Sequence, residues 1–219
     1  MSEMDQKGNP PTTLLLCRHG ESQWNVEGRV QGTSLQAAGL TEQGRWQAAR
    51  LAERLRSAEL SALYSSDLLR AEETAGVIAA TVGRSPELDR RWREIDMGKW
   101  QGLTLAEIQE RFPEDWAATR LDPNAPRGGG ETFATFQART LQAAAELHAR
   151  HPGQTVAVVT HGGNVRACLL SGVTGPLDPS DPRRGHIPNT SVTAIQVNGG
   201  HVTVLSLPDA GHLEATHAR

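Results

Sequence analysis

The chain has 219 residues, of which 37% are hydrophobic and 21% are charged, and its formal net charge at pH 7 is −3. This length suits one large domain, or at most two small ones, and the weakly acidic balance gives no bulk attraction to nucleic acid or anionic membranes. No apolar run approaches the length that spans a bilayer, and residues 1–13 lack the apolar stretch of a secretory signal. We therefore expect a cytoplasmic protein without nucleic-acid or membrane partners.

The first predicted element is a short strand of four apolar residues, Leu14–Cys17, after a lead-in at residues 1–11 that we expect to be disordered. Consecutive apolar residues indicate a strand that is buried on both faces. An arginine, a histidine and a glycine follow at once, Arg18-His19-Gly20. Packing gives no reason for a cation and an imidazole there, whereas ligands of open α/β sheets bind beyond the carboxyl ends of the strands. The pattern predicts a ligand site.

The chain then alternates between helices and strands. A helix begins after the N-cap Thr41, a strand follows at residues 62–66, and a second helix is predicted at residues 67–82. The apolar stripe of the first helix is expected to be Trp46, Ala49, Ala52 and Leu55. Such alternation is typical of a mostly parallel sheet with helices on both faces.

The middle of the chain departs from this pattern. Residues 88–96 are predicted to be extended, and a short helix is predicted at residues 105–112. We interpret residues 98–130 as an insertion that caps the pocket. The triple glycine at its end, residues 128–130, suits a hinge or a plain loop, and the plain loop is preferred. A long helix follows at residues 132–151.

The opening pattern then recurs. A β-branched strand at residues 155–160 ends on His161-Gly162-Gly163, and a helix is predicted from Asn164 onward. If the two histidine-bearing strands are neighbours, both imidazoles face one cleft. Amide donors at the start of the second helix would then favour an anion in that cleft.

A hairpin is predicted at residues 190–197 and 201–207, and residues 208–219 are expected to be a frayed tail, so residues 12–207 form a single catalytic domain. Zinc-ligand spacings, the Gly-x-Ser-x-Gly elbow of serine hydrolases and a phosphate-binding P-loop are all absent from the sequence. We therefore expect neither a metal nor a cofactor.

Four stretches of the chain, in this order, resemble sequence blocks of the histidine phosphatase superfamily, in its phosphoglycerate-mutase-like branch. They are Leu16–Asn25, Tyr64–Ala75, Arg93–Gly102 and Val159–Gly163. The resemblance covers residues 14 to about 170, most of the chain. It implies a three-layer α/β/α fold, with a mostly parallel central sheet, helices on both faces and a small cap insertion.

The resemblance also implies roles for individual residues. His19 would be the nucleophile, attacking phosphorus in line as a neutral imidazole to form a phosphohistidine. Arg18 and Arg70 would hold the phosphoryl oxygens, because a guanidinium meets oxyanions bidentately and keeps its charge. Positioning and electrostatics of this kind suffice in principle for phosphoryl transfer.

The remaining roles follow in the same way. His161 would bind another phosphoryl oxygen, with Asn25 and the Gly162 amide as further donors. Glu94 would donate a proton to the leaving oxygen and then activate water as a base. Without the resemblance, Glu94 would be read as a surface carboxylate paired with Arg93 or Arg91.

A phosphatase and a mutase share the phosphohistidine, and three departures favour the phosphatase. Residues 102–105 read Gly-Leu-Thr-Leu where family mutases carry Gly-Leu-Asn-Lys, residues 111–120 offer no adjacent arginine pair, and Gln31-Gly32 stands in place of Gly-Trp. We therefore expect a phosphomonoester hydrolase for a small phosphorylated metabolite, with broad specificity as an option. The alternatives are a cofactor-dependent phosphoglycerate mutase and a non-catalytic phosphoprotein-binding module, which would have no need of Glu94. The physiological substrate and the oligomeric state are left open.

Overall fold

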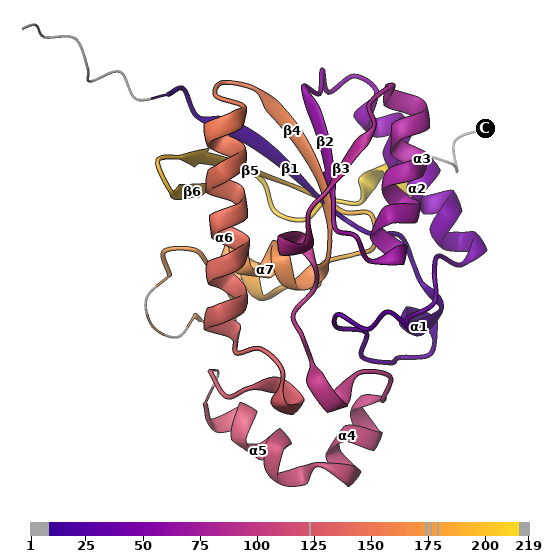
Figure 1. The fold of residues 1–219 in the computed structure, drawn as a ribbon, viewed down its shortest axis with the longest axis vertical. Coiled ribbons are helices and arrows are strands. Elements are labelled where there is room, and N and C mark those ends of the chain that lie inside the picture. Colours follow the sequence, from indigo (N-terminus) through magenta and orange to yellow (C-terminus); the bar gives the residue numbers. More distant parts are fainter. Residues whose placement is uncertain (1–8, 123, 174, 176, 179, 215–219) are drawn as a thin grey trace, which may run out of the picture.

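The computed structural model describes residues 9–122, 124–173, 175, 177–178 and 180–214. Six strands form one mixed sheet in the order β3-β2-β4-β1-β5-β6 (Figure 1). The four strands from β3 to β1 pair in parallel, whereas β5 and β6 run antiparallel to their neighbours. The strands are β1 (Thr12–Arg18), β2 (Ala62–Ser65), β3 (Pro86–Leu88), β4 (Thr155–Thr160), β5 (Val192–Asn198) and β6 (His201–Val204).

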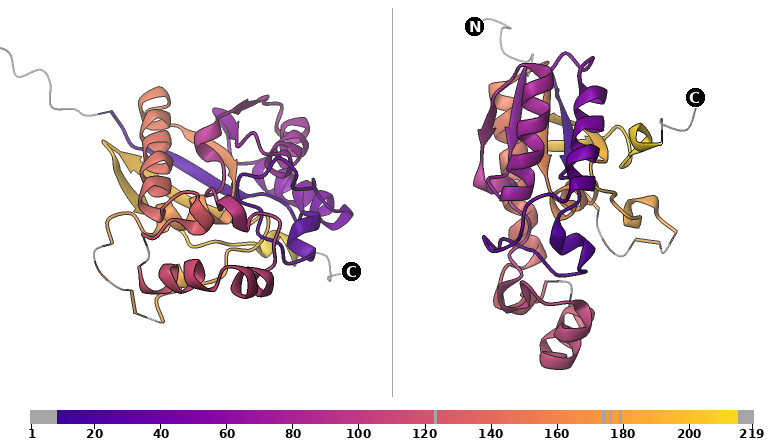
Figure 2. Two further views of the ribbon diagram at one scale, coloured as in Figure 1. Left: turned by 60° about the horizontal axis from the view of Figure 1, so that its bottom comes forward. Right: turned by 90° about the vertical axis from the view of Figure 1, so that its right-hand side faces the viewer.

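Helices cover both faces of the sheet and give three layers (Figures 1 and 2). The α-helices are α1 (Gln23–Val26), α2 (Glu42–Leu55), α3 (Leu69–Val82), α4 (Leu105–Arg111), α5 (Pro113–Leu121), α6 (Phe133–Arg150) and α7 (Gly162–Leu169). Helices α6 and α7 pack on the face that carries Leu14 and Val156, and α2 and α3 pack on the face that carries Cys17 and Ala157. The predicted three-layer fold is confirmed. None of the described helices is long and apolar enough to cross a membrane.

The register of the two central strands positions the site. Arg18 at the end of β1 lies opposite Thr160 at the end of β4. His19 and His161 therefore follow their strands at the same edge, and the His19 amide donates to the Thr160 carbonyl at 2.9 Å. Burial of both strands on both faces fixes this register, because a shift of one residue would exchange the two faces.

The buried stripe of α2 differs from the predicted one. Trp46 is 38% exposed and Ala49 is exposed, whereas Ala52 and Leu55 are buried as expected. The buried residues of this helix are Gly44, Ala48, Leu51, Ala52 and Leu55. The helix is rotated so that Gly44 meets the loop after β1, where an added Cβ would lie 2.0 Å from the Glu21 carbonyl oxygen. The buried face therefore combines a close backbone approach at Gly44 with the apolar side chains of Ala48, Leu51, Ala52 and Leu55.

The middle of the chain contains more helix than predicted. Residues 88–96 are mostly not extended, because β3 ends at Leu88 and a short 3-10 turn covers Arg90–Trp92. The sequence analysis also missed α5, which begins at Pro113 directly after α4. Proline is favoured in the first turn of a helix, so Pro113 suits the start of α5. Figure 1 shows α4 and α5 beyond the carboxyl ends of the strands.

The triple glycine and the chain ends are ordered in the described residues. An added Cβ at Gly128 would lie 2.4 Å from the Met97 carbonyl oxygen, so this segment is a tightly packed 3-10 turn, neither hinge nor plain loop. The tail is not frayed as far as residue 214, because the Asp209 backbone pairs with Val192 and its carboxylate pairs with Arg54. Residues 1–8 and 215–219 of the expected lead-in and tail lie outside the described residues.

Candidate active site

His19 is buried at the carboxyl end of β1 with a defined tautomer. Its Nδ1 lies 2.7 Å from the Gly20 carbonyl oxygen. A carbonyl only accepts, so Nδ1 carries the proton and Nε2 keeps its lone pair. The Nε–H of Arg70 donates to this Nε2 at 3.2 Å. The potential nucleophilic atom therefore already faces a guanidinium.

Burial lowers the pKa of His19 well below its usual range, and the positive charges of Arg70 and Arg18 lower it further. The imidazole is therefore neutral at physiological pH. An imidazole of ordinary pKa would already be neutral enough to act as a nucleophile. The site lowers the pKa of His19 further, so that a smaller fraction of the imidazole is protonated.

The backbone around His19 is held by a loop far away in the chain. The Thr190 amide donates to the Arg18 carbonyl at 3.1 Å, and the Asn189 side-chain amide donates to the His19 carbonyl at 3.0 Å. On the other side, the Gly20 amide donates to the Thr74 hydroxyl at 3.0 Å. These contacts fix the ring position, and no sequence pattern pointed to Asn189.

The two predicted arginines flank His19. Arg70 is buried on α3 and donates from Nη2 to the Gly32 carbonyl at 3.0 Å. Arg18 donates from Nη1 to the Ile187 carbonyl at 2.5 Å, while its buried Nε has no partner among the described residues. Burial lowers the pKa of both groups, to about 10 for Arg70, and the Glu94 charge opposes this shift. Both remain cationic at neutral pH.

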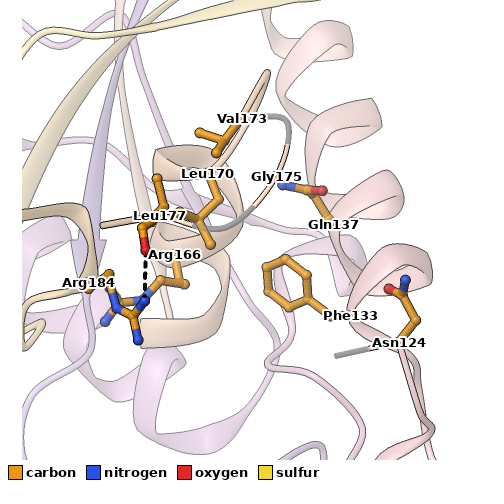
Figure 3. Close-up of a pocket in the computed structure, with 9 residues that line it drawn as sticks. All are labelled: Asn124, Phe133, Gln137, Arg166, Leu170, Val173, Gly175, Leu177 and Arg184. Carbon is orange, nitrogen blue, oxygen red and sulfur yellow. Dashed lines mark hydrogen bonds between the residues drawn. The ribbon is translucent and has the colours of Figure 1, made fainter. Parts of the chain in front are cut away.

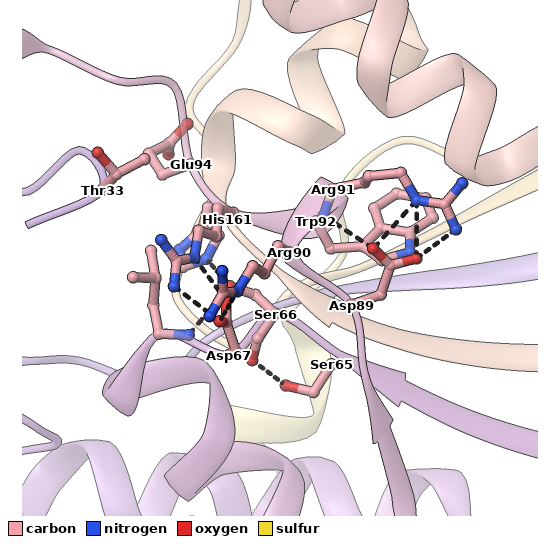
Figure 4. Close-up of polar contacts among 12 residues, drawn as sticks. Thr33, Ser65, Ser66, Asp67, Asp89, Arg90, Arg91, Trp92, Glu94 and His161 are labelled. Carbon is pink, nitrogen blue, oxygen red and sulfur yellow. Dashed lines mark hydrogen bonds and ion pairs between the residues drawn. The ribbon is translucent and has the colours of Figure 1, made fainter. Parts of the chain in front are cut away.

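His161 lies beside His19, as the strand register predicts. The two ring centroids are 5.2 Å apart, and His161 Nε2 lies 2.9 Å from the Ser66 hydroxyl (Figure 4). Burial lowers its pKa well below the usual range, and the positive charges of Arg70 and Arg18 lower it further. His161 is fully buried and does not line the cavity described below, whereas both imidazoles were expected to face it. Its Nδ1 is buried without a partner among the described residues.

Glu94 is fixed by backbone amides rather than by the neighbouring arginines. Its Oε2 accepts from the Gly163 amide at 3.0 Å and its Oε1 from the Ile95 amide at 2.9 Å. Arg93 instead pairs with Asp67. Arg91 pairs with Asp89 (Figure 4). The alternative interpretation, that Glu94 is a surface carboxylate paired with Arg93 or Arg91, is therefore wrong.

The other two predicted donors lie at the same edge. Asn25 Oδ1 accepts from the Ser22 amide and hydroxyl, at 3.1 Å each, which leaves the side-chain NH₂ as the end available to a ligand. Gly162 is the first residue of α7, two residues earlier than predicted, and an added Cβ there would lie 3.7 Å from Arg18 Nε. All seven predicted site residues thus gather at one edge of the sheet.

Arg139 on α6 braces the segment that carries Glu94. Its guanidinium pairs with Glu131 at 2.7 Å and donates at 2.8 Å to the main-chain carbonyls of Arg91, Arg93 and Glu94. Glu131 in turn accepts from the Asp96 amide at 2.9 Å. A fork with five donors suits this task. Sequence patterns gave no sign of it, because Arg139 sits among the polar positions of an ordinary amphipathic helix.

A cavity of about 310 Å³ opens at these residues. Its lining is Arg18, His19, Asn25, Arg29, Val30, Gln31, Gly32, Arg70, Glu94, Ile95, Met97, Arg127 and Gly163. Four of these side chains are guanidinium groups and one is a carboxylate. The sequence analysis missed two of the guanidiniums, Arg29 and Arg127. The cavity is strongly cationic, which suits a phosphoryl group.

A larger cavity of about 720 Å³ lies elsewhere, between α6, α7 and the loop after α7 (Figure 3). Its two arginines are committed to main-chain carbonyls: Arg166 donates to Arg183 and Gly185, and Arg184 donates to Leu177. None of the predicted site residues lines it. Size alone therefore does not identify the reactive site.

The chain is similar to known proteins over most of its length. The sequence model of the histidine phosphatase superfamily (branch 1) matches residues 14–210. Phosphoglycerate mutase-like protein 4 of Arabidopsis thaliana is 37% identical over 98% of this chain and 93% of that protein. The metal-independent phosphoserine phosphatase of the same plant is 37% identical over 93% of this chain and 84% of its own length. Among solved structures, Bacillus stearothermophilus YhfR superposes with a TM-score of 0.80 at 39% identity, covering 92% of this chain and 99% of YhfR.

Proposed function

Because this chain belongs to the histidine phosphatase superfamily, we propose that it hydrolyses a small phosphomonoester through a phosphohistidine on His19. The chain is a phosphatase of that family, and the proposal concerns which residues do the chemistry. The observation that carries it is the His19 tautomer: a neutral ring with Nε2 unprotonated and facing the Arg70 guanidinium. A phosphoryl group in the cavity would contact both His19 Nε2 and the Arg70 guanidinium, whose positive charge would offset the negative charge of the phosphoryl oxygens.

In the first half-reaction, the Nε2 lone pair attacks phosphorus, forming a nitrogen–phosphorus bond as the ester oxygen leaves. Arg70 Nε–H then turns from the imidazole to a phosphoryl oxygen, and the unpartnered Arg18 Nε binds a second oxygen. Glu94 gives its proton to the leaving alcohol oxygen, which avoids expelling an alkoxide.

In the second half-reaction, the Glu94 carboxylate takes a proton from water as the water oxygen attacks phosphorus. The nitrogen–phosphorus bond breaks, inorganic phosphate leaves and Glu94 holds the proton for the next turnover. Asn25 and the Gly162 amide donate to phosphoryl oxygens. His161 packs beside His19, with the ring centroids 5.2 Å apart, and its unpartnered Nδ1 is a further polar group for the phosphoryl charge as it develops.

The test is a rapid quench of the enzyme with a radiolabelled phosphomonoester. We expect label on the wild-type protein that is stable in base, labile in acid and released by water, and no label on His19→Ala. Label that appears equally on both proteins, or never on the wild type, would refute the proposal.

The same experiment separates hydrolysis from mutase chemistry. The departures at residues 102–105 and 111–120 favour hydrolysis, and so does the similarity to a metal-independent phosphoserine phosphatase. A chase with 2,3-bisphosphoglycerate and monophosphoglycerate should release the label as inorganic phosphate. Transfer of the label to the glycerate would establish the mutase instead.

A further inference from the structure

Ser66 is a buried side chain at the site that the proposed mechanism does not use. It follows β2 directly, and its amide donates to the Val159 carbonyl at 2.9 Å. Because β2 and β4 pair in parallel, Ser66 and His161 follow neighbouring strands at the same edge of the sheet. Both residues are fully buried, and the Ser66 hydroxyl lies 2.9 Å from His161 Nε2 (Figure 4). Ser66 therefore contacts a residue of the mechanism directly.

The other contact of Ser66 shows which partner donates. The Leu68 amide, just before α3, donates to the Ser66 hydroxyl oxygen at 3.3 Å. The hydroxyl proton then needs an acceptor, and among the described residues the one available is His161 Nε2. Since burial keeps the pKa of His161 well below its usual range, the ring is neutral and carries one proton. If Nε2 accepts from Ser66, that proton lies on Nδ1.

The opposite tautomer of His161 fits the surroundings less well. With the proton on Nε2, the ring would donate to Ser66, and the hydroxyl proton would have no acceptor within the described part of the chain. The buried Nδ1 would also be a lone pair without a partner. Two buried polar groups would then be unsatisfied instead of one, and each such group is costly. With the proton on Nδ1, the one unsatisfied group is a donor, which a phosphoryl oxygen can satisfy.

We infer that Ser66 is a positioning residue, whose hydroxyl holds His161 in the tautomer that donates from Nδ1 to a phosphoryl oxygen. This inference rests on the proposed function and adds the group that decides how His161 takes part in it. The two imidazoles of the site are then held in the same tautomer by opposite means. The Gly20 carbonyl accepts from Nδ1 of His19, which keeps a lone pair on its Nε2 for phosphorus. The Ser66 hydroxyl donates to Nε2 of His161, which keeps a proton on its Nδ1.

The test measures the tautomer directly, by NMR spectra of the ¹⁵N-labelled enzyme at neutral pH that distinguish protonated from unprotonated ring nitrogens. The His161 signals are assigned by their loss in His161→Asn. We expect Nδ1 to be protonated in the wild type and a form protonated on Nε2 to appear in Ser66→Ala. Ser65→Ala is the matched control, because it removes a neighbouring buried hydroxyl that donates to the Ser66 carbonyl at 2.8 Å and does not contact His161. It should leave the tautomer unchanged.

The activity of the same variants supplies a second readout. In Ser66→Ala, kcat/KM for a phosphomonoester should fall by ~10–100-fold, the range for a buried polar group that loses its partner. Ser65→Ala should keep the wild-type value. If Ser66→Ala does not fold, Ser66→Cys takes its place, because a thiol is close in size and a weaker donor. It should show the form protonated on Nε2 in part.

These readouts separate the inference from the proposed function. The tautomer needs no turnover to be observed, so it tests the inference even if no phosphoenzyme forms. A phosphoenzyme on His19 together with a wild-type His161 protonated on Nε2 would keep the proposed function and overturn the inference. A fall in kcat/KM of Ser66→Ala with an unchanged tautomer would show a merely structural serine, and equal losses in Ser65→Ala would do the same.

Discussion

Gly163→Ala provides a sharp test of Glu94 without altering the carboxylate. An alanine Cβ at this position would lie 1.9 Å from Glu94 Oε1 and 3.0 Å from the Phe136 ring. Ordinary contact begins near 3.4 Å, so the carboxylate must move by about 1.5 Å, which separates it from the Gly163 amide. Without this clash, alanine within α7 would be favoured over glycine by ~0.5–1 kcal/mol.

The expected effect depends on the leaving group. A displacement of this size, together with the loss of general acid catalysis, should lower kcat/KM for an alkyl phosphate by ~10²–10³-fold. The effect on p-nitrophenyl phosphate should be less than ~10-fold, because nitrophenolate leaves without a proton. The ratio kcat/KM is the right measure, since it reports only the steps up to the phosphoenzyme.

A matched control is available in the chain. Gly76 lies on α3 with open space where a Cβ would be added, so Gly76→Ala should leave both rates unchanged. Equal losses of Gly163→Ala on both esters, or an unaffected alkyl ester, would refute the assignment of Glu94 as the proton donor.

Two further predictions concern stability. The folded state holds the pKa values of His19 and His161 well below 6.5, whereas the unfolded chain protonates both near that value. The free energy of unfolding should therefore fall as the pH drops below ~6.5, by ~1.4 kcal/mol per pH unit for each histidine until the folded pKa is reached, and should be steady above it. Urea titrations from pH 7.5 to 5.5 should show a shallower loss for His161→Asn, and parallel curves would contradict the reasoning. Arg139→Lys keeps the charge but loses the fork, so it should cost ~2–3 kcal/mol and lower kcat by releasing the Glu94 segment. Arg150→Lys on the same helix, whose pair with Glu87 is exposed, should cost less than ~1 kcal/mol in the same urea titration. Equal costs for the two variants would show that the Arg139 brace is unimportant.

The sequence predicted the centre of the fold well, because the information there is local. Leu14–Cys17 and residues 155–160 read as buried strands, and strand polarity alone brings the histidines that follow them to one edge. The roles of Arg70 and Glu94 were different. Neither stands out by its spacing, and only the resemblance to a family singled them out.

The features that the sequence did not predict share a physical cause, which is contact between segments that are far apart in the chain. Trp46 was expected to be buried because it is apolar, but α2 is rotated so that Gly44 fits closely against Glu21 and Trp46 is exposed. Arg139 looks like a solvated cation in the sequence, and its importance depends on the Glu131 carboxylate and on three main-chain carbonyls that only the fold brings near. The periodicity of apolar residues predicts which face of a segment is buried. It does not predict which distant carbonyl group a side chain of that segment will contact.

The hydrogen bonds that Asn189 and Thr190 make to the backbone around His19 have a consequence for how the protein is synthesised. His19 is synthesised before Asn189, which holds its carbonyl and follows 170 positions later. Strand β4, which lies between β1 and β2 in the sheet, is also synthesised after both of them. A nascent chain therefore carries His19 through the synthesis of the next 170 residues without the side chain that holds its carbonyl in place.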